Sequence, residues 1–114
     1  MILRLWSGWT TSALAPAHDQ VLDAEVAPAI VARRLTGLSA FEVWTRRHEE
    51  LGGEQEFLTA MWFDDLDAVA EFTGGDPHAS VVPPAARRVL TRFDARSRHY
   101  ELRARHLPRR AGSR

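Results

Sequence analysis

The stretch that decides the fold is MWFDDLDAVAEFTGGD, residues 61–76. It combines the end of an apolar strand, a capped helix and a glycine stop. Asp65 is a good N-cap because its carboxylate can accept hydrogen bonds from the free N–H groups of the first helical turn. Apolar residues then recur at the three- and four-residue spacing of an amphipathic helix. Gly74 and Gly75 favour the left-handed conformation that ends many helices. We therefore predict a strand, then a helix that starts after Asp65 and stops at the glycine pair.

The composition is that of one ordinary globular domain. The 114 residues are 45% hydrophobic and 26% charged,. Fifteen basic residues balance fifteen acidic ones, so we expect neither nucleic acid nor a membrane as partner,. There is no Cys, which excludes disulfides, thiolate metal sites and cysteine nucleophiles,. We see no signal-peptide layout and no apolar run near the roughly 20 residues that cross a bilayer. We therefore expect a cytoplasmic protein, where thiols would be kept reduced.

Before this stretch, the pattern predicts a strand, a helix and a hairpin. Residues 2–10 alternate like a strand, and residues 13–34 keep a helical spacing,. Pro28 either kinks one long helix or opens a second one at its first turn. Residues 39–46 and 56–63 alternate again and predict a hairpin.

Four further features concern the connections and the end of the chain. A charged turn is predicted at residues 47–53. Residues 84 to about 93 predict a short helix with Val89, Leu90 and Phe93 on its buried side. Residues 95–103 predict a last strand. The basic segment 104–114 is expected to be a disordered tail.

The order β-α-β-β-α-β predicts an α+β protein with the ferredoxin-like fold, one domain over residues 1–103. Its four-stranded antiparallel sheet carries helices on one face and leaves the other face bare. Large apolar surface in water marks an association site, and this chain has four Trp residues,. We therefore expect a second copy to cover the sheet and form a homodimer.

Residues 62–76 resemble the strand-to-helix signature of the antibiotic biosynthesis monooxygenase-like family. Residues 2–10 are similar to the family's first strand. Its C-terminal portion is matched by Val81-Val82-Pro83-Pro84, then Leu90 and Phe93, then His99-Tyr100-Glu101-Leu102. The resemblance covers about residues 1–103 and is weakest in the first helix. It implies a dimeric α/β barrel, in which two ferredoxin-like subunits pack sheet to sheet with a cavity in each.

The resemblance also implies a function. Members of this superfamily include monooxygenases that oxidise small aromatic, quinone-forming substrates without metal, flavin or haem. Such an enzyme needs an aromatic cage, a donor for the substrate anion and a base. Our candidates for the donor and the base are Arg4, His78 and His99. Our candidates for substrate binding are Trp6, Trp44, Phe57, Trp62 and Tyr100.

Each candidate also has a structural interpretation. The stem of Arg4 could pack while its head reaches water. The Trp residues could belong to the core or to a dimer interface. His99 could be a hydrogen-bonded structural histidine, His78 an exposed loop residue, and Tyr100 a packed ring with its hydroxyl at the edge.

Other functions stay open. The chain could be a non-catalytic dimeric module that binds a small ligand or is associated with stress. Haem-degrading relatives use a Trp and an iron-binding His, and Phe72 and Val82 stand at those positions. His78 could replace that His only if its segment is helical. The His residues are scattered and predict no metal site.

Overall fold

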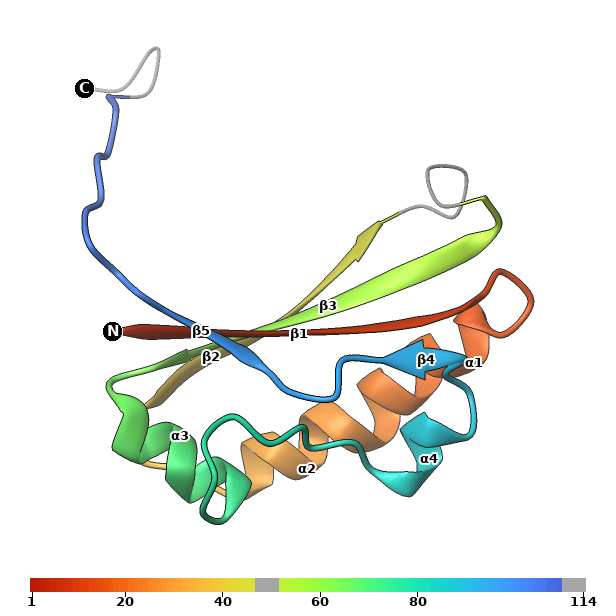
Figure 1. The fold of residues 1–114 in the computed structure, drawn as a ribbon, viewed down its shortest axis with the longest axis horizontal. Coiled ribbons are helices and arrows are strands. Elements are labelled where there is room, and N and C mark those ends of the chain that lie inside the picture. Colours follow the sequence, from red (N-terminus) through yellow and green to blue (C-terminus); the bar gives the residue numbers. More distant parts are fainter. Residues whose placement is uncertain (47–51, 110–114) are drawn as a thin grey trace.

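The computed structural model describes residues 1–46 and 52–109. An antiparallel sheet lies above a layer of helices, which all pack on one of its faces (Figure 1). The strands are β1 (Ile2–Thr11), β2 (Leu38–Arg46), β3 (Glu54–Phe63), β4 (Arg92–Phe93) and β5 (Arg98–Glu101). The helical segments are α1 (Ala15–Val21), the π-helical η1 (Leu22–Val26), α2 (Ala27–Ala32), α3 (Leu66–Thr73) and α4 (Pro84–Arg87). The predicted α+β class and ferredoxin-like arrangement are confirmed.

The sheet has the order β2-β3-β1, and both β4 and β5 pair with the remaining edge of β1. Strands β2 and β3 form the predicted antiparallel hairpin. Five residues of the predicted charged turn, 47–51, lie outside the described residues. The central strands β1 and β3 pair along their whole length, which makes them the rigid base for side chains that point toward the helices.

The last third of the chain differs from the prediction. The helix expected at residues 84–93 is only α4, and its last two residues form the short strand β4 instead. The strand expected at 95–103 is present as β5, which is shorter than predicted. The cause is hydrogen bonding to the edge of β1. Thr91 donates its N–H to the carbonyl of Trp9, and Asp94 donates its N–H to that of Ser7. Phe93 therefore belongs to a strand that pairs with Gly8, and not to a helix.

The predicted helix at residues 13–34 is one continuous rod with a π-helical middle. The N–H of Ala27 bonds to the carbonyl of Leu22, five residues back, which is the mark of a π turn,. Pro28 follows at the start of α2, where its missing N–H removes one helical hydrogen bond,. The widened turn before Pro28 lets the rod continue across it.

Helix α3 has the predicted ends. The Asp65 carboxylate accepts the N–H of Ala68 at 2.8 Å, and Gly74 ends the helix in the left-handed region at φ 84°. Its buried side, Val69 and Phe72, packs on the sheet in a core cluster with Ile2 of β1 and with Met61 and Phe63 of β3. The cap and the glycine stop thus place Phe72 at a fixed depth below the sheet.

The other face of the sheet has no described helix over it (Figure 1). Register aligns Tyr100, Leu3, Trp62 and Ala40 in one apolar row across four strands. Residues 102–109 form no helix or strand, are exposed, and run away from the domain on this same side (Figure 1). This sheet face, which no described helix covers, is therefore apolar and partly exposed.

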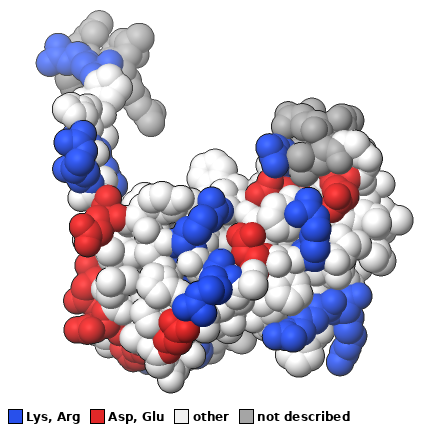
Figure 2. Space-filling model, viewed as in Figure 1, with Lys and Arg blue, Asp and Glu red and all other residues white. Residues whose placement is uncertain are grey.

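Charges of one sign gather at two places on the side of the molecule that Figure 2 shows, and acidic and basic residues are mixed between them. Acidic side chains gather around α3, where Asp64, Asp65, Asp67 and Glu71 surround a shallow depression. Arginines gather at the opposite end, around α4 (Figure 2).

In the part of the chain that the structure describes, no helix is long and apolar enough to cross a membrane.

Candidate functional site

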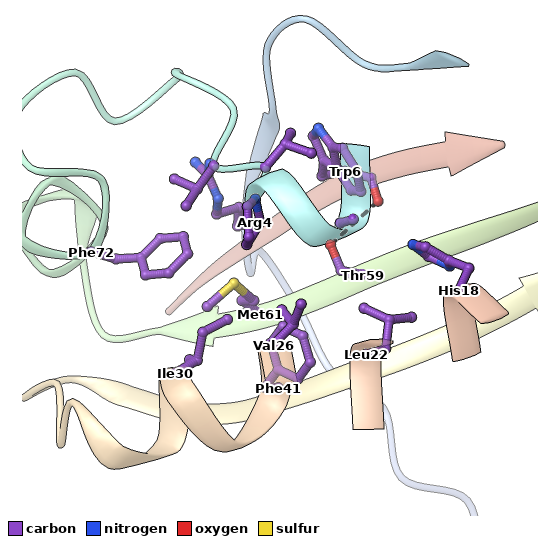
Figure 3. Close-up of a pocket in the computed structure, with 14 residues that line it drawn as sticks. Arg4, Trp6, His18, Leu22, Val26, Ile30, Phe41, Thr59, Met61 and Phe72 are labelled. Carbon is purple, nitrogen blue, oxygen red and sulfur yellow. Dashed lines mark hydrogen bonds between the residues drawn. The ribbon is translucent and has the colours of Figure 1, made fainter. Parts of the chain in front are cut away.

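A cavity of about 50 Å³ lies between the helices and the covered face of the sheet (Figure 3). Its walls come from β1, β2, β3, the α1–η1–α2 rod, α3 and the segment that leads into α4. The lining residues are Arg4, Trp6, His18, Leu22, Val26, Ile30, Phe41, Thr59, Met61, Phe72, Val81, Val82, Pro83 and Ala86. Most of these side chains are apolar, and Arg4, His18 and Thr59 supply the polar exceptions. Such a lining, with few polar groups, is typical of small-molecule sites.

A second, outer space of about 360 Å³ adjoins this cavity. Five apolar residues line both spaces and so form the boundary between them: Val26, Ile30, Phe72, Val81 and Pro83. Glu25 and Arg33 add charged groups to the outer space only. A ligand would therefore enter past an apolar collar, with the charged residues outside it.

The π turn in the helical rod shapes the cavity wall. His18, Leu22, Val26 and Ile30 all line the cavity at a strict four-residue spacing. In a regular α-helix, a four-residue spacing repeated three times drifts by about 120° around the axis. The extra residue in the π turn at 22–26 offsets part of this drift. Single π turns inside helices are frequent at functional sites, and this one keeps His18 and Ile30 on the same wall.

Arg4 lies at the roof of the cavity, where it ties a loop to the sheet. The side chain is only 3% exposed. Its guanidinium donates to the carbonyls of Pro77 and Ala79 and contacts His99 Nε2 at 3.0 Å. Its carbon Cζ also lies 5.4 Å from the centre of the Phe72 ring. Arg4 thus lines the cavity while most of its hydrogen bonds hold the loop.

His99 and His78 form a chain of hydrogen bonds that starts at Arg4. A guanidinium can only donate, so His99 Nε2 is the acceptor and its proton lies on Nδ1,. That Nδ1 is 3.2 Å from His78 Nδ1, which must then be an acceptor. Burial, then the charges of Arg4 and His78, lower the pKa of His99 to about 4. His99 is therefore neutral near pH 7, and its acceptor atom is already engaged by Arg4.

His18 is the polar residue that the sequence analysis did not single out. Its ring reaches from α1 into the cavity near Thr59 (Figure 3) and is 1% exposed. It packs edge-on against Phe57 with 4.3 Å between ring centres. Within residues 1–46 and 52–109, its Nδ1 has no hydrogen-bond partner. Burial lowers its pKa, against a smaller opposing effect of Asp19. Its sequence signal was weak: one polar residue in a helical apolar stripe.

The structure separates the predicted site residues into groups. Arg4 and Trp6 line the cavity, and the Trp6 indole N–H bonds to Ser80 Oγ and the Asp94 carbonyl. Phe57 is fully buried behind His18. His78 and His99 meet beside Arg4 and are not among the described residues that line either space.

Three predicted cage residues lie on the uncovered face of the sheet. Trp44 and Trp62 both donate their indole N–H to the Glu42 carboxylate, each at 3.2 Å. Tyr100 pairs with Leu3 on the same face and is 49% exposed. These rings therefore point away from the cavity, because neighbouring residues of a strand alternate between its faces.

The described residues can also be compared with what a metal or haem site requires. Among the residues it describes, no three His, Asp or Glu side chains gather closely enough to hold a metal ion. Val82, at the position of the haem-binding His, is buried in the cavity wall. His78 lies in a turn and not in a helix, so the condition for it to replace that His is not met.

The fold is shared with solved structures of one named kind. A structure described as a "putative antibiotic biosynthesis monooxygenase" from Bacillus cereus matches with a TM-score of 0.63 and 9% identity, covering 96% of this chain and 98% of the other. A second with that description, from Deinococcus radiodurans, matches with a TM-score of 0.60 and 16% identity, covering 96% and 99%. Neither a family model nor a curated protein sequence matches the chain. At these identities the likeness establishes the fold, and function must be argued from the site.

Proposed function

We propose that this chain is a monooxygenase that oxidises a small hydroxyaromatic compound in the cavity between helices and sheet, without metal, flavin or haem. One observation carries the proposal: the covered face holds a mostly apolar cavity that adjoins the larger outer space, with a buried cation, Arg4, at its roof. The description of the two solved structures with this fold points to the same reaction class.

Oxidation of a phenolate by dioxygen needs few catalytic groups from the protein. A phenol that loses its proton becomes an electron-rich anion that reacts directly with dioxygen. With a free para position, the phenol and one O₂ give one quinone and one water, so one oxygen atom enters the product and no other oxidant is needed. The positive charge of Arg4 favours the anion over the neutral phenol. The apolar side chains of the collar offer water no hydrogen-bond partners, and a less polar surrounding strengthens that interaction.

We also propose a homodimer that forms through the uncovered sheet face. The apolar row from Tyr100 to Ala40 and the exposed Trp44 are what support it. A second copy would bury this face, because the fold offers the same surface on each chain. The lack of Cys agrees with a cytoplasmic location, which we include in the proposal,.

Oxygen uptake with a set of naphthols and naphthalenediols, in the presence of EDTA and without added cofactor, tests the proposal. The decisive variant is Ile30→Trp, which fills the collar shared by both spaces. Val31→Trp is the matched control, since Val31 is the next residue and is 68% exposed. We expect uptake in the wild type and in Val31→Trp, and at least a tenfold loss in Ile30→Trp. Uptake that is absent in the wild type, or equal in the two variants, contradicts the proposal.

A non-catalytic binding module is the second candidate, and a specific observation favours it. Of the three predicted catalytic residues, Arg4 is largely committed to loop carbonyls and His99 uses its acceptor atom on Arg4. The same assay separates the candidates. Naphthol binding that Ile30→Trp abolishes, with no oxygen uptake in any protein, would support a binding module.

A further inference from the structure

We propose that Glu42, Trp44 and Trp62 form a binding site for a guanidinium group, and that an arginine from a second copy of this chain occupies it. The arginine comes from the arm, residues 102–109, which follows β5. This inference rests on the proposed homodimer and deepens it, because it names the groups that each copy offers to the other.

The site consists of one carboxylate that two indole rings hold in place. Glu42 and Trp44 are two residues apart in β2, and Trp62 lies on the neighbouring strand β3, so all three side chains leave the uncovered face,. Both indole N–H groups donate to the same oxygen, Glu42 Oε1, each at 3.2 Å. Within residues 1–46 and 52–109, the other oxygen accepts no hydrogen bond and no arginine pairs with this carboxylate. One carboxylate oxygen is therefore left for a ligand.

Two other carboxylates on the same face already have an arginine partner. Glu56 pairs with Arg46 at 2.8 Å, and Glu54 pairs with Arg92 at 3.3 Å. The Cζ atom of Arg92 also lies 3.9 Å from the ring centre of Trp9, so a carboxylate, an indole and a guanidinium occur together at that end of the sheet. The proposed site has the same carboxylate and indole groups, and among the described residues it lacks the guanidinium.

The chemistry of these groups selects an arginine. The flat fork of a guanidinium matches the oxygens of a carboxylate, and its planar face stacks on aromatic rings. Indole is the aromatic ring that attracts a cation most strongly. The chain contains no Lys, so the permanently charged side chains that a second copy can offer are arginines.

The arm presents arginines on the correct side of the sheet. Its arginines are Arg103, Arg105 and Arg109. All three are exposed, and within the described part of the chain they form no ion pair or hydrogen bond. The arm begins where the N–H of Leu102 bonds to the carbonyl of Met1, and it runs away from its own domain on the side of the uncovered face (Figure 1). A second copy packed on that face would lie along its path.

The length of the arm fits the distance that it must cover. Strands β5 and β2 lie on opposite sides of the β1–β3 pair, three strand spacings or about 14 Å apart,. Residues 102–109 in an extended chain span about 25 Å. The arm can therefore cross a facing sheet as far as β2. Because β2 is an edge strand, the site is also accessible from the rim of the proposed interface.

Conservative changes test the site and the arm separately. Glu42→Gln keeps an oxygen for the two indoles but removes the charge, and changing the three arm arginines to Gln removes the opposite charge. We expect the dissociation constant of the dimer, measured by analytical ultracentrifugation, to rise roughly tenfold or more in each variant. Glu71→Gln is the control. It removes an exposed carboxylate from α3, on the helical side of the molecule, and should keep the wild-type value.

A mixing experiment tests whether the arm reaches another chain. One variant carries Glu42→Arg, and the other has all three arm arginines changed to Glu. Each variant alone brings like charges together, so each should dimerise roughly tenfold more weakly than the wild type, or worse. A mixed dimer pairs opposite charges at both of its sites if the arm crosses between chains. We therefore expect the mixture to form mixed dimers with nearly wild-type affinity. An arm that folds back on its own chain would restore nothing on mixing.

The outcomes separate this inference from the homodimer proposal. A wild-type dimer that Glu42→Gln and the arm variant both leave unchanged overturns the inference, and the homodimer stands. A mixture that forms no mixed dimers also overturns the inference. A wild type that stays a single chain at every concentration refutes the homodimer, and the inference with it. Mixed dimers also show that both variants fold, since only folded chains can restore the pairing.

Discussion

Arg4 is a buried cation, and its burial determines which hydrogen-bond partners its guanidinium needs. Desolvation lowers its pKa to about 10, while the charge of Asp76 opposes that change. The group stays charged near pH 7, and a buried charge requires partners. It finds them in the carbonyls of Pro77 and Ala79, so the side chain that could steady a ligand anion also fixes the loop.

Replacing Arg4 by Met should lower the free energy of unfolding by about 2–4 kcal/mol, because two carbonyls would lose charged hydrogen bonds. Arg33→Met is a close control. Arg33 also donates to two carbonyls, and its Cζ lies the same 5.4 Å from the Phe72 ring, but it is exposed. We expect a loss below about 1 kcal/mol there. Urea unfolding measures both values, and similar losses would show that burial of Arg4 is not the cause.

The burial of His99, and next to it the charge of Arg4, should make stability depend on pH. The folded protein keeps His99 neutral down to about pH 4, while an unfolded histidine takes up its proton near pH 6.5,. Between these values the unfolded chain binds more protons, so stability is full above pH 6.5 and falls as the solution is acidified. His18, whose pKa is also lowered, acts in the same direction.

The measurement is the urea midpoint at several pH values from 7.5 to 4.5. The wild-type midpoint should fall through this range, and His99→Gln should fall less, because glutamine has no proton to take up. His106→Gln in the exposed tail should follow the wild type. Parallel curves for the wild type and His99→Gln would rule out His99 as a source of the pH dependence.

At the scale of helices and strands, local patterns were the best guide. The Asp65 cap, the Gly74 stop and the β2–β3 hairpin were predicted because each depends on residues close together in the sequence,. The last third was predicted less well. Whether residues 88–94 form a helix or a strand depends on donors and acceptors at the edge of β1, more than 75 residues away.

The cap of α3 offers a direct test of local reasoning. Asp65→Ala should lower the free energy of unfolding by about 1 kcal/mol, because the Ala68 N–H loses its acceptor,. Asp67→Ala removes a carboxylate from the same first turn but leaves the cap in place, so about 0.3 kcal/mol is expected,. Thermal and urea unfolding of the two variants compare these effects. Equal losses would mean that charge near the helix end matters more than the capping bond.

At the scale of the whole molecule, the sequence identified the fold but not which residues meet. Arg4 contacts a loop 73 residues away, and such a pairing follows from tertiary packing alone. The alternating pattern correctly divided the strand residues between the two faces of the sheet. It did not indicate which of the two faces the helices would cover. That uncertainty put Trp44, Trp62 and Tyr100 among the cavity candidates, although they lie on the opposite face.

A substitution on this opposite face tests the proposed homodimer. Trp44 is 59% exposed in the single chain, and Trp44→Arg would place a charge in the proposed interface. We expect light scattering to give twice the chain mass for the wild type and a shift toward the single chain for Trp44→Arg. Val31→Arg, at a 68% exposed position of α2, should leave the mass unchanged. A wild type that already runs as a single chain would refute the dimer.

The sheet separates two surfaces, with the cavity under one face and the apolar row on the other. Arg4 and Leu3 are neighbours in β1, yet one lines the cavity and the other belongs to the row. Because adjacent residues serve different faces, either surface can be altered by substitutions that leave the other intact. The proposed ligand binding and the proposed subunit pairing can therefore evolve as separate traits within one short domain. For the same reason, ligand affinity should not change with protein concentration.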